Sequence, residues 1–498
     1  MDAVVYDFAI DYDIRRVLNH QEAALESNDR LRVTHIRVAN LFGRYTHEVP
    51  LRTDDRVTII HGPNGVGKTV LLRLTAALLS GDMLTLAKTP FQTFEVTLSD
   101  GSVLGVERTE IFDNWLMRPE DESPAGVWRL KRGDRVVRKT DLRVTTDAVA
   151  RLAARVARDA PWLNPIGDTG DFWGDFGEML TVDEVLERHI ASLPLPLLSQ
   201  WSDELFGVGI FDTPDWMVDI QGRVQVRLIE TQRLLRLPGV PVSALRRTKD
   251  EETIPLATVE ACAHDLQQRL AATLASSAQQ SQALDRSFPQ RLLHGDLHAL
   301  SAPELHARLH DLAAKQQRFE RLGLTDADPL AASLDTATLE MLDDTRRAVM
   351  TLYVQDVERK LGALDDLARR IEKFLDAINR HLIHKSIVVN RHSGLTVVTD
   401  QDRPIQLASL SSGEQHQVVL LYDLLFRVQP NTLVLIDEPE LSLHLTWQKG
   451  FVPDVLEIAS MVGCDVVLAT HSPFIVDDRH DLMVPLLPER ESEEEIDA

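Results

Sequence analysis

The chain has 498 residues, of which 44% are hydrophobic and 26% are charged, and its formal net charge is -24 at pH 7. This composition is ordinary for a globular protein of two or three domains, and the acidic balance argues against indiscriminate coating of nucleic acid. Only two cysteines occur, Cys262 and Cys464, which excludes a disulfide framework and a cysteine-type metal site.

The first residues, MDAVVYDFAIDYD, are acidic and lack the basic-then-apolar layout of a signal peptide. No apolar run approaches the roughly 18 residues needed to span a bilayer. We therefore expect a cytoplasmic protein without membrane contact.

The N-terminal part of the chain reads as strands around one glycine loop. Residues 31–45 alternate apolar and polar side chains, and residues 56–62 form an apolar run that ends at the loop. Residues 69–81 have helical spacing and end in glycine. Residues 91–108 and 126–139 each place a Gly-Asp or Asp-Gly pair between apolar runs, which predicts two hairpins.

The middle of the chain is predominantly helical. Residues 145–219 are mixed in pattern and rich in Trp and Pro, and no element is assigned there. Residues 224–236 return to a strand pattern, and residues 258–384 repeat apolar side chains at three- and four-residue steps. The heptads are imperfect, so a helical lobe with a short antiparallel arm is favoured over a long coiled coil. Residues 385–407 read as a hairpin.

The loop GPNGVGKT, residues 62–69, matches the P-loop pattern G-x-x-x-x-G-K-[ST]. In such a loop the backbone N–H groups surround phosphate oxygens at a helix N-terminus. Lys68 is expected to reach the β and γ phosphates, and the hydroxyl of Thr69 to bind Mg²⁺. The strand predicted before the loop and the helix predicted after it make a chance match improbable.

Two further apolar runs, TLVLIDEPE and CDVVLATHSPF, are typical of buried parallel strands. The first ends at Asp437, a candidate Mg²⁺ ligand, followed by Glu438, a candidate base for the attacking water. The second is followed by His471, which is a candidate contact for the γ phosphate. Gln232, after VRLIE, is the candidate sensor of Mg²⁺ and of the attacking water. Taken alone, the Asp-Glu pair is equally consistent with an ordinary strand end, a lone histidine such as His471 is more often structural, and Gln232 is unremarkable.

A second phosphate-facing helix start occurs in LSSGEQH, residues 410–416, where no lysine follows. Two copies of the chain, packed head to tail about a two-fold axis, would each lend Ser411, Ser412 and Gly413 to the nucleotide of the other. The chain would then carry two such loops because each ATP needs both.

In this order, the P-loop, Gln232, LSSGEQ, the Asp-Glu strand and His471 resemble the ATP-binding cassette (ABC) ATPases. They resemble more closely the SMC and RecF-like branch, in which a helical insertion separates the two halves of the ATPase. The segments ETQRLL, LSSGEQH, IDEPELSLH and ATHSPFIV are similar to bacterial AAA-type ATPases related to the OLD (overcoming lysogenization defect) proteins. Those include ATPase subunits of anti-phage systems such as Septu and PARIS. The motifs lie within residues 31–105 and 224–478.

The resemblance implies ATP and Mg²⁺ as cofactors and assigns a role to each matching position. Catalytic roles fall on Glu438, His471 and Gln232, and the Mg²⁺ ligands would be Thr69, Gln232 and Asp437. The residues implied in nucleotide contact are Gly62, Asn64, Gly65, Gly67, Lys68, Thr69, Ser411, Ser412, Gly413 and Glu414. The stretch from Glu440 to His444 departs from the usual small-residue-Asp loop of the family. Phe42 and Tyr45 are candidates for adenine stacking, with packing in the first hairpin as the alternative.

The implied fold is α/β: a P-loop ABC-ATPase head, with a parallel sheet core and an antiparallel subdomain, and an inserted helical lobe or short helical arm. The expected segments are a leader (1–30), ATPase lobe I (31–144), a mixed insertion (145–223), a Gln-loop segment (224–257), the helical lobe (258–385), ATPase lobe II (386–485) and an acidic tail (486–498).

The implied function is that of an ATP-gated dimeric switch or scaffold with slow, signal-dependent hydrolysis. It would be the sensor component of an anti-phage defence system whose effector is a separate nuclease or toxin. The alternatives are a RecF-like repair ATPase that clamps DNA and a nucleotide-dependent scaffold that barely turns over. A homodimer is expected, and a higher homo-oligomer is left open. The basic stretches at residues 131–139 and 233–249 are candidate nucleic-acid contacts, although a solvated face is the favoured interpretation. No nuclease motif is expected.

Overall fold

The computed structural model describes residues 30–82, 85–86, 89–109, 126–133, 135–142, 164–166, 171–173, 179–180, 215–230, 258–294, 298–325, 336–443 and 445–486. These residues form two compact units. The first contains the described residues from 30 to 230 and from 428 to 486, and the second those from 258 to 427. Sheets and helices occur in both units, which confirms the predicted α/β class.

A five-stranded sheet in which every neighbouring pair is parallel lies in the first unit, with the order β11-β15-β16-β3-β17. Its strands are β3 (Val57–His61), β11 (Gln225–Glu230), β15 (Thr432–Asp437), β16 (Asp465–Thr470) and β17 (Met483–Pro485). Every residue of β16 is buried, as expected for a parallel strand covered on both faces. The strands predicted from the apolar runs before the P-loop, in TLVLIDEPE and in CDVVLATHSPF are therefore confirmed.

Helices connect and cover these strands. They are α2 (Lys68–Ser80), α7 (Asp215–Arg223), α14 (Leu445–Val462) and α15 (Pro473–Val476), with short 3-10 turns η6 (Pro439–Ser442) and η7 (His480–Leu482). Helix α2 packs against β11, β15 and β16, and α14 packs against β16 and β3. Helix α2 ends at Gly81, whose φ of 81° is left-handed, as the predicted glycine stop requires.

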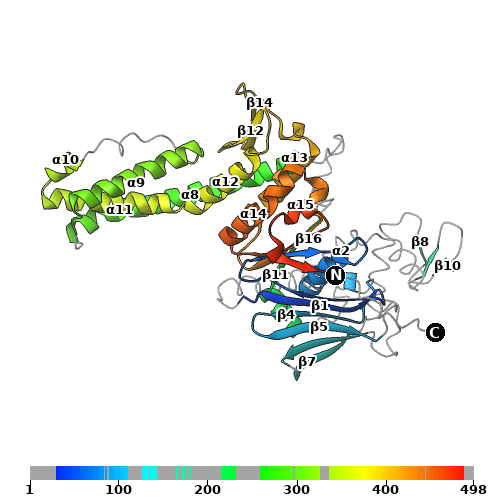
Figure 1. Ribbon diagram of the computed structural model, residues 1–498. Coiled ribbons are helices and arrows are strands. Elements are labelled where there is room, and N and C mark those ends of the chain that lie inside the picture. Colours follow the sequence, from blue (N-terminus) through cyan, green and yellow to red (C-terminus); the bar gives the residue numbers. More distant parts are fainter. Residues whose placement is uncertain are drawn as a thin grey trace. The chain divides into compact units, whose positions relative to one another are not determined.

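A six-stranded antiparallel sheet also lies in the first unit, in the order β2-β1-β4-β5-β6-β7 (Figure 1). Its strands are β1 (Val33–Leu41), β2 (Tyr45–Pro50), β4 (Thr93–Leu98), β5 (Ser102–Arg108), β6 (Gly126–Arg132) and β7 (Arg135–Leu142). Both predicted hairpins, β4–β5 and β6–β7, are present. Ile36 of β1, Phe94 of β4, Leu71 of α2 and Leu435 of β15 belong to one buried core. This core joins the antiparallel sheet to the parallel one through α2.

A small sheet of three strands lies in the stretch for which the sequence assigned no element. Its order is β10-β9-β8, with β8 (Asn164–Ile166), β9 (Asp171–Trp173) and β10 (Met179–Leu180).

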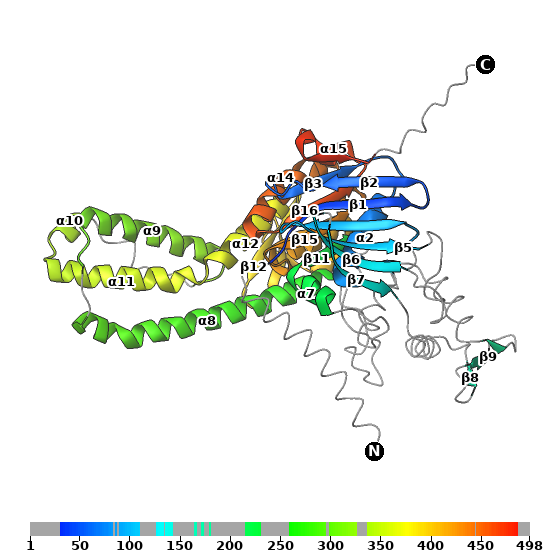
Figure 2. The same ribbon diagram turned by 90° about the horizontal axis from the view of Figure 1, so that it is seen from below.

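The second unit consists mainly of helices, as predicted for residues 258–384 (Figure 2). They are α8 (Thr258–His294), α9 (Ala302–Arg321), α10 (Thr336–Glu340), α11 (Asp344–Gly362), α12 (Asp365–Asn379) and α13 (Ser412–Tyr422). Ser301 and Glu304 form a capping box that begins α9, and the carboxylate of Asp343 caps α11. Arg291 of α8 donates two 2.6 Å hydrogen bonds to Asp356 of α11, which ties these two helices together.

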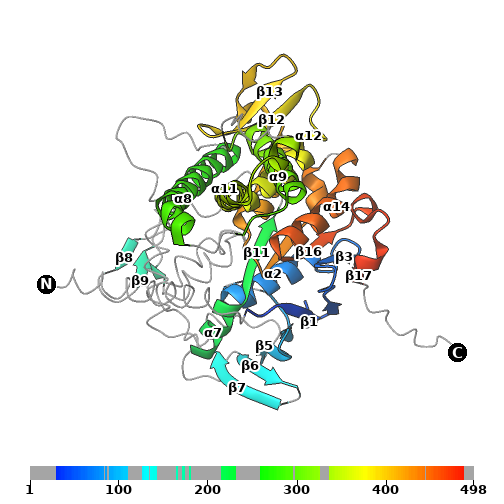
Figure 3. The same cartoon turned by 90° about the vertical axis from the view of Figure 1, so that its left-hand side faces the viewer.

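A three-stranded sheet accompanies these helices, with β12 (Lys385–Asn390), β13 (Gly394–Thr399) and β14 (Pro404–Ile405) followed by the 3-10 turn η4 (Leu407–Ser409). Strand β12 packs against α12 (Figure 3). Strand β13 approaches α8 so closely that a Cβ at Gly394 would lie 1.8 Å from the backbone oxygen of Ala263. Only glycine permits this contact, and its φ of 69° also favours glycine.

Helix α13 continues into a π-helical turn, η5 (Asp423–Arg427), and both are attached to the neighbouring helices. The hydroxyl of Tyr422 donates a 2.6 Å hydrogen bond to Asp265 of α8. The rings of Phe374, Tyr422 and Phe426 pack against one another, with centroids 4.8 to 6.3 Å apart. The segment that begins with LSSGEQ is thus held on α8 and α12, and it belongs to the second unit.

Candidate active site

The predicted P-loop connects β3 to α2, and its shape depends on glycine at three positions. A Cβ at Gly62 would lie 2.6 Å from the backbone oxygen of Leu486. Gly65 and Gly67 have φ angles of 84° and 96°, in the left-handed region that other residues rarely adopt. Asn64 is exposed at the tip of the loop. The glycines therefore allow the backbone conformation of the loop, as the motif predicts.

Lys68 is the first residue of α2, and its side chain is only 4% exposed. Its Nζ donates hydrogen bonds to the carbonyl oxygens of Gly62 and Pro63, at 2.8 and 3.1 Å. His47 Nε2 lies 2.7 Å from the carbonyl oxygen of Val66 and must donate to it, because a carbonyl oxygen only accepts. Sequence reasoning missed His47; its signal is the alternation of β2, which places this side chain on the buried face.

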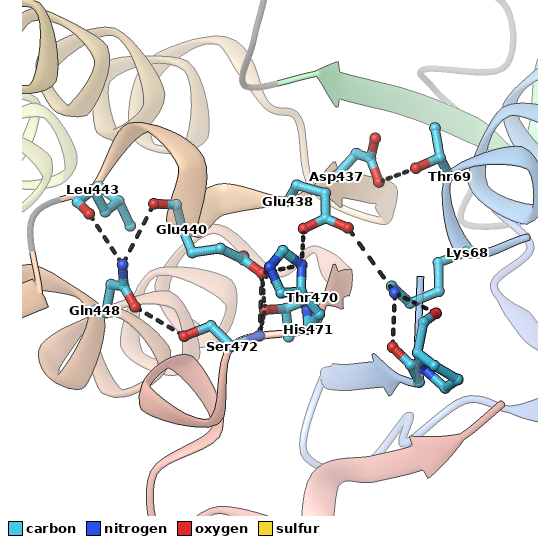
Figure 4. Close-up of polar contacts among 12 residues, drawn as sticks. Lys68, Thr69, Asp437, Glu438, Glu440, Leu443, Gln448, Thr470, His471 and Ser472 are labelled. Atoms are coloured by element: carbon cyan, nitrogen blue, oxygen red, sulfur yellow. Dashed lines mark hydrogen bonds and ion pairs between the residues drawn. The ribbon is translucent and has the colours of Figure 1, made fainter. Parts of the chain in front are cut away.

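The carboxyl ends of the parallel strands bring the other predicted residues to the P-loop. In register, Glu230 pairs with Asp437, and Asp437 pairs with Ala469, two residues before His471. The hydroxyl of Thr69 donates a 2.9 Å hydrogen bond to Asp437 Oδ1, across 368 positions of sequence (Figure 4). The side chains of Thr69 and Asp437, two of the three predicted Mg²⁺ ligands, therefore lie together.

The charge environment of Asp437 includes the ion pair between Arg73 and Glu230. Burial raises the pKa of the Asp437 carboxyl, while the hydrogen bond from Thr69 and the charge of Arg73 oppose that change. Arg73 of α2 donates a 2.7 Å hydrogen bond to Glu230, the last residue of β11. This pair was not predicted from the sequence. It balances the acidic charge beside Asp437.

Glu438 is the residue at which the chain leaves β15, and its φ of 48° is unusual for a side-chain-bearing residue. Such strain is often found at functional sites. One carboxylate oxygen, Oε1, lies 4.0 Å from Lys68 Nζ, and the other, Oε2, lies 2.5 Å from His471 Nδ1. Burial and the neighbouring charge of Glu440 raise the pKa of the Glu438 carboxyl, against the effect of His471. A raised pKa suits a general base.

The side chains of Glu438, Glu440 and His471 also offer ligand atoms within 4.8 Å of one another. Contacts between His471 and the two carboxylates already account for this cluster. Glu440 was noted in the sequence only as a departure from the family pattern. Its position two residues after Glu438 was the available signal.

The signature segment begins α13, in the second unit. Ser411 and Glu414 form a capping box: Glu414 N donates to Ser411 Oγ at 3.4 Å, and Ser411 N donates to Glu414 Oε2 at 2.8 Å. Lys385 of β12 also donates to Glu414 Oε2, at 2.9 Å. Glu414 is thus engaged at the start of its own helix, whereas Ser412 is exposed and Gly413 is half-buried.

Two other predictions concern residues near the first hairpin and the Gln loop. Gln232 lies outside the described residues, so its contact with Mg²⁺ stays a prediction. The ring of Tyr45 stacks on His47 with centroids 5.8 Å apart, which is the packing alternative considered for it. Phe42 is exposed.

Residues 283–477 match the family described as "AAA domain, putative AbiEii toxin, Type IV TA system". This range includes the signature segment, Asp437, Glu438 and His471, and the P-loop precedes it. The match covers less than half of the chain and shows that this range is similar to an AAA-family ATPase domain. No curated protein matches the chain.

Among solved structures, the chain is similar to the Smc head domain with an extended coiled coil from Pyrococcus furiosus, with 13% identity over 92% of this chain and 94% of that chain, and a TM-score of 0.32. The SMC head domain from Thermotoga maritima has 11% identity over 89% of this chain and 91% of that chain, and a TM-score of 0.30. Scores this low do not define how the whole chain folds. Within the described residues, no helix combines the length and apolarity that crossing a membrane requires.

Proposed function

We propose that the protein binds and hydrolyses ATP as an SMC-like ABC ATPase. The observation that carries this proposal is the convergence of Lys68, Thr69, Asp437, Glu438 and His471 at the carboxyl ends of β3, β15 and β16. These residues supply a phosphate-binding loop, a pair of oxygen ligands for a metal ion, a carboxylate and a histidine. Phosphoryl transfer to water requires groups of these kinds.

The residues present fit Mg²⁺-ATP. The buried ammonium of Lys68 is held by the loop's own carbonyl oxygens, in a position from which it can turn to phosphate oxygens. Thr69 and Asp437, already 2.9 Å apart, would hold Mg²⁺, which neutralises developing charge on the phosphates. Glu438 would accept the proton of the attacking water, and His471 would orient Glu438 through its 2.5 Å contact.

We infer further that two copies complete each site. Ser411 and Glu414 form the capping box of α13. The exposed Ser412 and the N-terminus of the helix would face a phosphate of the nucleotide that is bound to the second copy. The dimer would then form with ATP and separate after hydrolysis, as a switch.

For the biological role, we propose the sensor component of an anti-phage defence system with a separate effector. The support is the resemblance of the motifs and the description of the matching family, which names a toxin of a Type IV TA system. Co-purification with the product of a neighbouring gene, in the presence and absence of ATP, tests this role. Salt-dependent DNA binding by the isolated protein would instead favour a DNA clamp.

The primary test is ATP binding and hydrolysis by the purified full chain, with and without Mg²⁺. We expect binding that depends on Lys68 and slow hydrolysis that depends on Mg²⁺ and Glu438. Lys68→Ala should abolish binding, because the phosphates lose their buried cation. Wild-type protein that binds no nucleotide in calorimetry would refute the proposal.

A further inference from the structure

Glu440 is a buried carboxylate in the turn η6, two residues after Glu438. A single oxygen, Oε1, accepts three hydrogen bonds from three successive residues that follow or end β16 (Figure 4). The donors are the hydroxyl of Thr470 at 2.6 Å, the backbone N–H of His471 at 2.9 Å and that of Ser472 at 3.2 Å. Hydrogen bonds to an ionised acceptor are about twice as strong as those between neutral groups, so this carboxylate is a firm anchor for the loop.

A second buried side chain reinforces the same connection. Gln448 of α14 accepts a 2.9 Å hydrogen bond from the hydroxyl of Ser472. Its Nε2 donates to the carbonyl oxygen of Leu443 at 3.1 Å. The side chains of Glu440 and Gln448, both buried, therefore join the turn after β15 to the turn after β16.

The connection determines where the imidazole of His471 is attached. Because the backbone N–H of His471 donates to Glu440, the backbone from which the ring projects is held beside the carboxylates, and the contacts of Nδ1 then orient the ring itself. In this position His471 Nδ1 lies 2.5 Å from Glu438 Oε2 and 3.2 Å from Glu440 Oε1. No hydrogen bond joins Glu440 to the P-loop in the part of the chain that the structure describes.

We propose that Glu440 is a positioning residue for ATP hydrolysis, which holds His471 against Glu438 and acts on turnover rather than on nucleotide binding. The proposal rests on the proposed ATPase function and assigns a role within it to a residue at which this chain departs from the ABC pattern. Among the described residues, the hydrogen bonds and ion pairs of Glu440 go to other residues than the P-loop and the predicted Mg²⁺ ligand Thr69.

Two substitutions of Glu440 test whether the acceptor oxygen is what matters: one keeps an oxygen at this position and the other removes it. Glu440→Gln retains an oxygen of the same reach, which can still accept from the loop, and its amide nitrogen takes the place of Oε2. That second oxygen accepts no hydrogen bond from the described residues. Glu440→Ala removes the acceptor and leaves the donors of Thr470, His471 and Ser472 without it. Glu48→Ala, at an exposed carboxylate of β2, is the matched control.

The experiment measures three quantities on the full chain: the Kd for ATP, kcat, and hydrogen–deuterium exchange of the amides of His471 and Ser472 without nucleotide. For Glu440→Ala we expect kcat to fall about 10- to 100-fold, since small displacements of catalytic groups have costs of this order. The Kd should stay within about threefold. The amide of His471 should exchange faster because it loses its acceptor, and that of Ser472 should change less because it also donates to Thr470 Oγ1 at 3.0 Å. Glu440→Gln should recover most of kcat and of the protection, and Glu48→Ala should match wild type.

Thr470→Val keeps the shape of the side chain and removes one of the three donors, so it tests the same idea if Glu440→Ala does not fold. It should lower kcat with an unchanged Kd. Wild-type kcat and wild-type exchange in both Glu440→Ala and Thr470→Val would overturn the proposal, as would a loss of ATP binding that parallels the loss of turnover. Failure of the wild type to bind ATP would refute the ATPase function instead, and the exchange measurement would still decide whether Glu440 holds the loop.

Discussion

Replacement of Glu438 by glutamine should stop hydrolysis and strengthen ATP binding. The amide keeps the shape of the side chain and removes its charge and its basicity. In the structure one oxygen of Glu438 lies 4.0 Å from Lys68 Nζ and the other 2.5 Å from His471 Nδ1. The substitution therefore removes the group that would accept the proton of water and releases the cation that would bind phosphate.

The size of both effects follows from this geometry. General base catalysis contributes about 10²- to 10⁴-fold, which corresponds to about 3 to 5 kcal/mol in the barrier. Two unit charges 4 Å apart attract by about 1 kcal/mol in water and about 4 kcal/mol at an effective dielectric constant of 20. The side chain of Lys68 is 4% exposed and that of Glu438 is 17% exposed, so the second value is the closer one. Because Lys68 must still leave the carbonyl oxygens of Gly62 and Pro63, we expect about tenfold tighter binding.

The assay pairs calorimetry of ATP binding with phosphate release, and light scattering with and without ATP adds the oligomeric state. ATP retained by both copies should stabilise the dimer, because in the shared site each ATP is contacted by both copies and is bound more tightly than by the monomer. Lys68→Ala combined with Glu438→Gln is the control, and it should stay monomeric. Hydrolysis within tenfold of wild type, or ATP binding weakened by tenfold, would refute the role of Glu438; an unchanged mass in ATP would refute the shared site.

Three other outcomes can be measured on the same protein. Ser412→Arg should leave ATP binding by the monomer intact and block turnover. A mixture of this variant with Lys68→Ala should recover some hydrolysis, because a heterodimer contains one intact shared site; no recovery would contradict the shared site. Gly62→Ala should abolish ATP binding in calorimetry, because its Cβ would lie 2.6 Å from a backbone oxygen; near-normal affinity would show that the loop adapts. Tyr422→Phe removes a 2.6 Å hydrogen bond to the carboxylate of Asp265 and should lower the free energy of unfolding by about 1.5–3 kcal/mol; an unchanged denaturation midpoint would contradict this.

The chemical identity of the site could be predicted from the sequence because its main parts are local. The glycines of the P-loop serve backbone geometry within eight residues, and Lys68 and Thr69 follow in the same turn. Asp437 and Glu438 come at the end of an apolar run that is also local. The helical segment and the hairpins were predicted for the same reason, since side-chain periodicity records which face of an element is buried.

The supporting residues could not be predicted, because their partners are distant in sequence. His47 supports the P-loop from β2, across 19 positions, and Arg73 reaches Glu230 across 157. Glu440 anchors a loop that lies about 30 positions further along the chain. Local patterns indicate that His47 is on the buried face of its strand and that Glu440 is near the Asp-Glu pair, but they do not indicate which distant residue each one contacts.

The sequence by itself determined which chemical groups the protein carries and the order in which they occur, because a glycine loop, an apolar strand and a helix start each depend on neighbouring residues. Only the tertiary structure decided that Thr69 meets Asp437, that Glu438 faces both Lys68 and His471, and that Glu440 holds the loop of His471. Those contacts depend on the order and register of the parallel strands. Register arises from the packing of whole elements into one core, and that packing is a property of the folded chain.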